Sequence, residues 1–212
     1  MQVSLISCTP NAEENIAYIA RVSSSRKDKR QDFQKLIKYL IKNRHWSPFE
    51  HSFMTFDIET SKAIGIQLLR HRSFTFQEFS QRYQDVQTIS EDMYERFNLR
   101  KQHANNRQSS DQDIDKSQDF FYDLINDHLL NTTKLYNKML EYGVSRETAR
   151  MILPMCTKTK IRMTGSVRSW IHFLEVRTES HAQLEMQELA KEIKKLVYNE
   201  LPVIANALEE LK

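Results

Sequence analysis

Glycine is scarce in this sequence, with three residues among 212. Phosphate-binding loops of the Walker and G-x-G-x-x-G types need glycines at fixed offsets, because the backbone must turn tightly and approach the ligand closely. The glycines at Gly65, Gly143 and Gly165 are too far apart to form either pattern. A nucleotide or a flavin would therefore have to be held by side chains rather than by a glycine-rich loop.

The composition is that of a folded globular chain. Apolar residues make up 40% and aromatic residues 10%, which is too apolar for a disordered chain, and 212 residues suit a single domain. The two cysteines, Cys8 and Cys156, argue against a disulfide scaffold and a structural zinc site, so we expect no metal. With no apolar run long enough for a bilayer and no signal peptide pattern, we expect a cytoplasmic protein.

Apolar spacing alternates between the strand and helix periods along the chain. It predicts strands at 2–8, 51–59 and 158–165, and helices at 11–20, 31–43, 61–70, 118–142, 145–153, 166–176 and 180–199. Asn11, Ser61 and Ser145 are the candidate N-caps. The mixture without strict alternation predicts an α+β fold, with a mostly antiparallel sheet flanked by long helices. We interpret the polar stretch at about 86–117 as a mobile surface excursion within one domain, 1–212.

The formal net charge is only +3, from 31 basic and 28 acidic residues, so anion binding would depend on local clusters. Arg70, His71 and Arg72 form one such cluster. Three adjacent basic side chains repel one another, and a bound anion would relieve that repulsion. Because adjacent side chains cannot all point the same way, the triplet would serve several ligands or both ends of a large one.

The segment 78–83 follows this triplet. If it is extended, Glu78, Ser80 and Arg82 lie on one face, because strand side chains alternate. A carboxylate, a hydroxyl and a guanidinium on one face suit a nucleoside monophosphate. The alternative is a solvated turn with an inert Glu78–Arg82 ion pair.

The pattern Arg70-His71-Arg72, seven residues, Ser80, then Arg82-Tyr83 resembles the R-H-R-x7-S signature of flavin-dependent thymidylate synthases, the thymidylate synthase complementing protein family. Further segments resemble that family in the right order and extend the similarity over about residues 10–205. They are Ala20–Ser23, His45–His51, Arg146–Arg150 running into Leu153-Pro154, Arg168–Arg177 and Ser180–Gln183.

The resemblance implies reductive methylation of dUMP to dTMP, with 5,10-methylenetetrahydrofolate as carbon donor and NADPH-reduced FAD as hydride donor. It implies a homotetramer with shared active sites and gives Arg177 the catalytic role. The implied dUMP-binding residues are Gln67, Arg70, Glu78, Ser80, Gln81, Arg82, Arg150 and Arg177. The implied FAD-binding residues are Ser23, Ser47, Glu50, Arg70, His71, Arg72, Glu78, Ser166, Arg168 and His172. The chain departs from the family pattern at Gln77, Gln81 and Ser166.

Residue chemistry supports part of this assignment. Arg168, His172 and Glu175 are spaced to share one helix face, from which Arg168 and His172 could together contact an anionic or aromatic ligand such as FAD. An exposed charged face without a ligand is the alternative. Neither cysteine lies in a motif, and Ser80 has no evident partner base, so we expect activation of dUMP without a protein nucleophile. Arg177 would then stabilise a deprotonated or polarised pyrimidine.

A nucleic-acid-binding module is the competing class of protein. Its basic surface, beside Trp46 and Tyr83, would comprise Arg26, Lys27, Lys29, Arg30, Lys42, Arg44, Arg70 and Arg72. The nearly balanced total charge and the lack of a known module count against it. A homologue that binds neither FAD nor dUMP is the third possibility. Bound flavin, seen as a yellow protein, would separate the enzyme from both.

Overall fold

The computed structural model describes residues 1–22, 33–115 and 118–211. The chain divides into two compact units. Unit 1 comprises Met1, Glu59–Leu68 and Glu78–Ile161; unit 2 comprises Gln2–Ile58, Leu69–Gln77 and Arg162–Lys212. The assignment of the whole chain to a single domain stays a prediction.

The main sheet has four strands in the order β1-β2-β6-β3 and is antiparallel, as predicted. They are β1 (Gln2–Cys8), β2 (Phe53–Ser61), β3 (Phe74–Glu78) and β6 (Lys158–Ser166). In β2 the predicted alternation is confirmed, because Met54, Phe56 and Ile58 are fully buried and Phe53 is half exposed. Together with the helices, this sheet makes the predicted α+β class correct.

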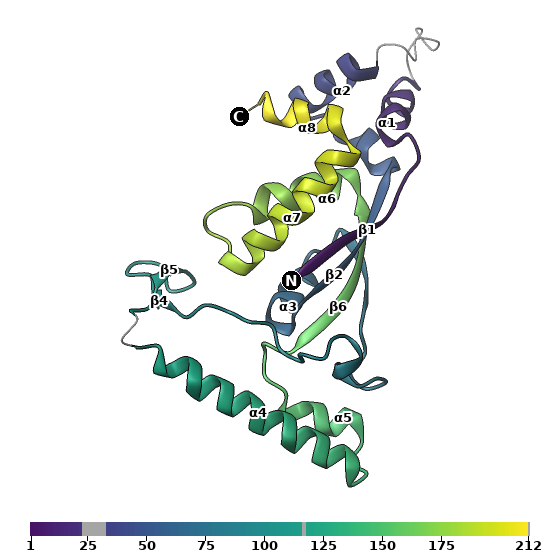
Figure 1. Cartoon of the computed structure of the whole chain (residues 1–212). Coiled ribbons are helices and arrows are strands. Elements are labelled where there is room, and N and C mark those ends of the chain that lie inside the picture. Colours follow the sequence, from purple (N-terminus) through teal and green to yellow (C-terminus); the bar gives the residue numbers. More distant parts are fainter. Residues whose placement is uncertain (23–32, 116–117, 212) are drawn as a thin grey trace. The chain divides into compact units, whose positions relative to one another are not determined.

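The helices of unit 2 pack against one another, and some of them also contact strands of the main sheet (Figure 1). They are α1 (Ala12–Ala20), α2 (Phe33–Lys42), the 3-10 helix η2 (Ser47–His51), α6 (Val167–Arg177), α7 (Leu184–Glu200) and α8 (Pro202–Glu209). Trp170 of α6 is fully buried between Phe56 and Phe74, and its indole N–H donates to the Met54 carbonyl at 3.1 Å. A side chain at Gly165 would lie 2.4 Å from the Phe74 ring, so this strand position needs glycine. The core thereby fixes α6 against the sheet.

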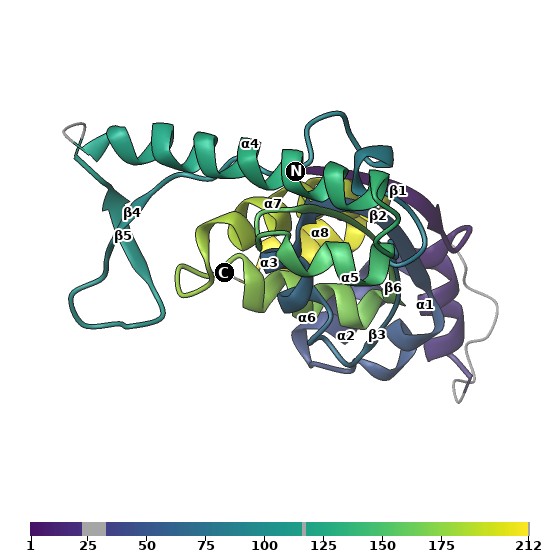
Figure 2. The same ribbon diagram turned by 90° about the horizontal axis from the view of Figure 1, so that it is seen from below.

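Unit 1 is built around the long helix α4, which lies beside α5 (Figure 2). Its elements are α3 (Lys62–Leu68), η3 (Val86–Thr88), β4 (Arg100–Gln102), β5 (Ser110–Asp113), α4 (Phe120–Glu141), α5 (Arg146–Ala149) and η5 (Arg150–Ile152). The core of this unit comprises Val86, Met93, Tyr94, Tyr136 and Ala149. In the described residues, no helix is long and apolar enough to cross a membrane.

The predicted helices and strands are present, with shifted ends. Ser61 caps α3 as expected, because its hydroxyl accepts from the Ile64 N–H. The predicted side-chain caps at Asn11 and Ser145 are wrong, since neither residue makes one. At Asn11 the backbone is left-handed, with φ 50° and ψ 41°, which replaces the extended backbone that a side-chain cap needs.

The polar stretch at 86–117 contains more structure than its sequence indicates. Val86, Met93 and Tyr94 are buried, and Tyr94 forms a bridge with Thr157. Farther along, β4 and β5 form an antiparallel hairpin. Sequence spacing also missed α8, although Pro202 at its first turn is a common helix-start signal.

Candidate functional site

The start of α6 in unit 2 brings together residues predicted to contact FAD. Ser166 is the N-cap of α6, and its hydroxyl accepts from the Ser169 N–H at 3.2 Å and donates to Glu50 at 2.6 Å. The Arg168 Nη1 lies 2.8 Å from the other carboxylate oxygen of Glu50. Glu50, Ser166 and Arg168, distant in sequence, therefore form one hydrogen-bonded group.

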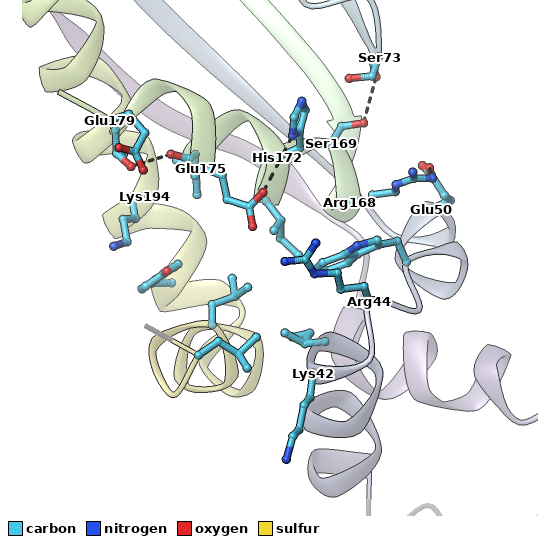
Figure 3. A pocket seen from close by; sticks show the side chains of 18 residues that line it. Lys42, Arg44, Glu50, Ser73, Arg168, Ser169, His172, Glu175, Glu179 and Lys194 are labelled. Carbon is cyan, nitrogen blue, oxygen red and sulfur yellow. Dashed lines mark hydrogen bonds and ion pairs between the residues drawn. The ribbon is translucent and has the colours of Figure 1, made fainter. Parts of the chain in front are cut away.

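A pocket of about 1030 Å³ opens beside this group (Figure 3). Arg168, His172 and Glu175 line it together, which confirms that they share one face of α6. The apolar stripe of Val167, Ile171 and Leu174 is buried. In Figure 3, Arg44, Glu50 and Arg168 lie at one end of the pocket and Glu179 and Lys194 at the other. The lining residues that sequence reasoning did not assign to FAD include Arg44, Trp46, Lys194 and Tyr198.

Arg177, near the C-terminus of α6, is held by the histidine of the basic triplet. Its Nε donates to the Nε2 of His71 at 2.8 Å, and the imidazole packs edge-on against Phe173 with ring centroids 5.0 Å apart. Burial, reinforced by the charges of Arg177 and His172, lowers the pKa of His71 to about 4. Burial also lowers the pKa of Arg177. The imidazole is therefore neutral at pH 7, which lets Nε2 accept this hydrogen bond and leaves the ring proton on Nδ1.

The rest of the triplet has a different environment. Arg70 and Arg72 are exposed on either side of the half-buried His71, which fits the divergence required of adjacent residues. Ser47, at the start of η2, is also exposed. Ser23, predicted to contact FAD, lies outside the described residues, as do Arg26, Lys27, Lys29 and Arg30 of the basic surface considered for nucleic acid.

The predicted extended face over 78–83 in unit 1 is wrong. Strand β3 ends at Glu78, and the Ser80 carbonyl then accepts from the backbone N–H groups of Tyr83 and Gln84, which closes a turn. The alternative Glu78–Arg82 ion pair is not formed either. Arg82 instead lies 3.3 Å from Glu147, in a pair whose side chains are both more than half exposed.

Glu78 has partners that the sequence did not reveal. Its Oε1 lies 2.8 Å from the Lys62 Nζ and accepts from the Thr159 hydroxyl at 2.9 Å. Lys62 starts α3 and Thr159 belongs to β6, so this cluster depends on how the strands and the helix meet. The structure therefore adds Lys62 and Thr159 to the residues around a predicted ligand contact.

A second, shallower pocket of about 390 Å³ lies in unit 1, lined by Ser80, Arg82, Tyr83, Ser145, Arg146 and Glu147. Gln81 is 6% exposed, and its side-chain amide nitrogen is buried without a hydrogen-bond partner among the described residues. Gln67 and Arg150 are both partly buried. Of the residues predicted to bind dUMP, unit 1 therefore brings Ser80 and Arg82 to one pocket.

The chemistry of the larger pocket fits a flavin dinucleotide. Its volume is at the upper end of the range for ligand pockets, as a ligand of that size requires. Arg168 and Arg44 supply guanidinium groups for phosphate, and Trp46 supplies an aromatic surface. The side chains present are thus sufficient in kind to hold FAD.

The family model and the curated relatives that this chain matches name the same family. The model of the family described as thymidylate synthase complementing protein matches residues 4–203. The probable flavin-dependent thymidylate synthase of Paramecium bursaria Chlorella virus 1 is 41% identical over 99% of each chain. The flavin-dependent thymidylate synthase of Synechocystis is also 41% identical, over 92% of this chain and 88% of its relative.

A solved structure with a similar fold is also a nucleotide methylase. A UMP/dUMP methylase, PolB from Streptomyces cacaoi, solved with bound 5-Br dUMP, is similar with a TM-score of 0.83 and 27% identity. The match covers 99% of this chain and 94% of the methylase chain. The family match spans nearly the whole sequence, and the chain belongs to the thymidylate synthase complementing protein family.

Proposed function

We propose that this protein is a flavin-dependent thymidylate synthase. It converts dUMP, 5,10-methylenetetrahydrofolate, NADPH and a proton into dTMP, tetrahydrofolate and NADP. The observation that carries the proposal is the grouping of Glu50, Ser166 and Arg168 at a pocket large enough for a dinucleotide, in a chain of this family.

FAD would be held by unit 2 through side chains. The Arg168 guanidinium and the start of α6 suit negative charge, because unpaired N–H groups and the helix dipole favour anions there. Glu50 orients Arg168 and Ser166 through its two carboxylate oxygens. Arg70, Arg72, Ser47 and His172 are the further contacts implied by the family pattern. When bound, FAD supplies the hydride that it has received from NADPH.

The nucleotide would be held mainly by unit 1. Arg82 and Ser80 line the smaller pocket and carry the donors that a phosphate needs. Lys62 and Thr159 fix one carboxylate oxygen of Glu78, which leaves the other oxygen to accept from a ligand donor. Gln67, Gln81 and Arg150 complete the proposed dUMP contacts.

Arg177 is the proposed catalytic residue. A guanidinium beside the pyrimidine stabilises negative charge as it develops on the ring, and a preorganised cation contributes several kcal/mol to such a step. His71 holds Nε of Arg177, which leaves the terminal nitrogens for the substrate. Because His71 is neutral at pH 7, it adds no competing charge. The pair therefore supplies one oriented positive charge.

No protein nucleophile is needed in this scheme. Burial raises the pKa of both Cys8 and Cys156, which makes each thiol less nucleophilic at neutral pH. Within the described residues, no side chain accepts a hydrogen bond from the Ser80 hydroxyl, so it lacks a base for activation. Ser80 is better suited to bind substrate.

We further propose assembly into a homotetramer with shared sites. Helix α4 has 22 residues, of which only Thr132 and Tyr136 are buried. It exposes large apolar side chains, namely Phe120, Phe121, Leu124, Leu130 and Leu135. Exposed apolar side chains of this size support burial of α4 against other copies of the chain. The free cysteines suit the reducing cytoplasm, where we place the enzyme.

The test is a flavin absorbance titration. Purified protein loaded with FAD should show the flavin bands, and addition of dUMP should shift them, because the pyrimidine stacks on the flavin ring. 2′-Deoxyuridine, which lacks only the 5′-phosphate of dUMP, is the matched control and should shift them far more weakly. Protein that binds no flavin, or a spectrum unchanged by saturating dUMP, would contradict the proposal.

A further inference from the structure

Helix α2 ends in a left-handed turn. The N–H of Arg44 donates to the Ile41 carbonyl at 3.0 Å, and the N–H of His45 donates to the Leu40 carbonyl at 2.8 Å. This pair of bonds is the Schellman motif, which requires a positive φ at its central residue. Arg44 occupies that position with φ 55°.

Helix α4 ends with the same hydrogen bonds but a different residue. There Gly143 donates to Leu140 at 3.0 Å and Val144 donates to Met139 at 2.9 Å, with φ 82° at the glycine. Glycine suits this conformation because it has no Cβ to clash with the neighbouring carbonyl. Arg44 therefore stands where local backbone preference favours glycine.

The strain at Arg44 has no evident local compensation. Within the described residues, the other non-glycine residue with positive φ is Asn11, a residue type that tolerates this conformation. Arg44 is exposed, and no carboxylate of the described part of the chain lies within ion-pair distance of it. Strained residues of this kind cluster at ligand sites. A bound anion would provide the partner that Arg44 lacks within the described residues.

Arg44 lines the larger pocket, at the end that also holds Arg168 (Figure 3). The lysines and arginines of the lining are Lys42, Arg44, Arg168 and Lys194, and its carboxylates are Glu50, Glu175 and Glu179. Glu50 already pairs with Arg168 at 2.8 Å. Ser169, in the first turn of α6, also lines the pocket, where the helix dipole adds to the attraction for an anion.

We propose that Arg44 binds the pyrophosphate of the flavin dinucleotide. The inference rests on the proposed function and adds a residue to its cofactor site. A planar guanidinium binds two phosphate oxygens at once, which makes arginine well suited to a pyrophosphate. The chain lacks the glycine-rich loops that usually hold this group, so side chains must neutralise it. An arginine at this position, which favours glycine, would supply positive charge to neutralise the pyrophosphate.

The test compares Arg44→Gly with Lys38→Gln. Lys38 is a cation on the same helix that pairs with Glu210 and does not line the pocket. We expect Arg44→Gly to weaken FAD binding roughly tenfold to a hundredfold, as loss of a charged hydrogen bond does. Riboflavin, which has no phosphate, should bind the variant and the wild type alike. Lys38→Gln should bind FAD as the wild type does.

A thermal melt of the flavin-free proteins separates ligand binding from folding. Relief of the left-handed strain should raise the melting temperature of Arg44→Gly by about 2–4 °C. Wild-type FAD affinity in Arg44→Gly would overturn the inference. So would a lower melting temperature with weaker FAD binding, or equal weakening of riboflavin binding. Wild-type protein that binds no FAD would contradict the proposed function itself, and the inference with it.

Discussion

The pocket of unit 2 and the pocket of unit 1 differ in volume and in how well their charged side chains are held by hydrogen bonds within one chain. In unit 2, Glu50 joins Ser166 and Arg168 through two hydrogen bonds, and the pocket has a volume of about 1030 Å³. In unit 1 the pocket has about 390 Å³, and its main ion pair, Arg82 with Glu147, is exposed. In our proposal, a single chain therefore largely prepares the flavin site in unit 2, whereas the nucleotide site in unit 1 is completed by the ligand and by another copy.

The largest effect should follow from Arg177→Ala in unit 2. Removal of a preorganised positive charge from the developing anion should lower kcat by about a hundredfold to a thousandfold. FAD binding should change little, because the group at Glu50 remains intact. The measurement is dTMP formation by flavin-loaded protein. Arg177→Lys, which keeps the charge, is the control; a wild-type rate in Arg177→Ala would remove the catalytic role.

The second prediction tests whether unit 1 needs another copy. Leu124→Glu places a carboxylate on the exposed apolar face of α4, where burial of an unpaired charge is costly, and should weaken self-association by about a hundredfold or more. Light scattering coupled to gel filtration measures the mass. Glu141→Gln, at the last residue of the same helix, is the control. A tetramer that persists unchanged in Leu124→Glu would show that this face is not an interface.

A smaller effect, on the KM for dUMP, is expected when the ion pair that holds the Glu78 carboxylate is removed. Lys62→Met deletes the ammonium group 2.8 Å from the carboxylate, and the loss of a charged hydrogen bond should raise the KM for dUMP about tenfold. The value of kcat should change less, because Lys62 positions a binding residue. Lys62→Arg should restore much of the affinity. Equal loss of kcat and of stability, with KM unchanged, would indicate a purely structural role.

The smallest effect concerns the protonation of His71. Its pKa of about 4 lies below the ordinary value of 6.5, so the unfolded chain takes up the proton first as the pH falls. The free energy of unfolding should therefore fall as the pH decreases from about 6.5 to about 4, and this titration should leave it unchanged above about pH 6.5. An NMR titration of the imidazole measures this pKa, and His71→Gln identifies its signal. An imidazole that titrates near 6.5 would contradict the lowering of the His71 pKa by burial and by the charge of Arg177.

Periodicity predicted those parts of the molecule whose burial follows from local spacing. The alternation in β2 and the shared face of Arg168, His172 and Glu175 are set by strand and helix geometry, and both are confirmed. The family resemblance correctly predicted the membership of the chain. The roles of the individual site residues remain predictions.

Turns, and contacts between residues that are distant in the chain, could not be predicted from the sequence. The extended face at 78–83 failed because the Ser80 carbonyl closes a turn, which apolar spacing does not report. The pairing of Lys62 with Glu78 depends on where β3 ends. The left-handed backbone at Arg44 could not be predicted, because glycine is the usual sequence signal for such a residue at a helix end and this helix ends without one.

The most direct test of the central claim is dTMP formation by protein that has been stripped of flavin and then reloaded. With dUMP, 5,10-methylenetetrahydrofolate and NADPH present, the flavin-free protein should form no dTMP, and FAD should restore the activity in proportion to its binding. Formation of dTMP without flavin, or none after FAD has bound, would contradict the account.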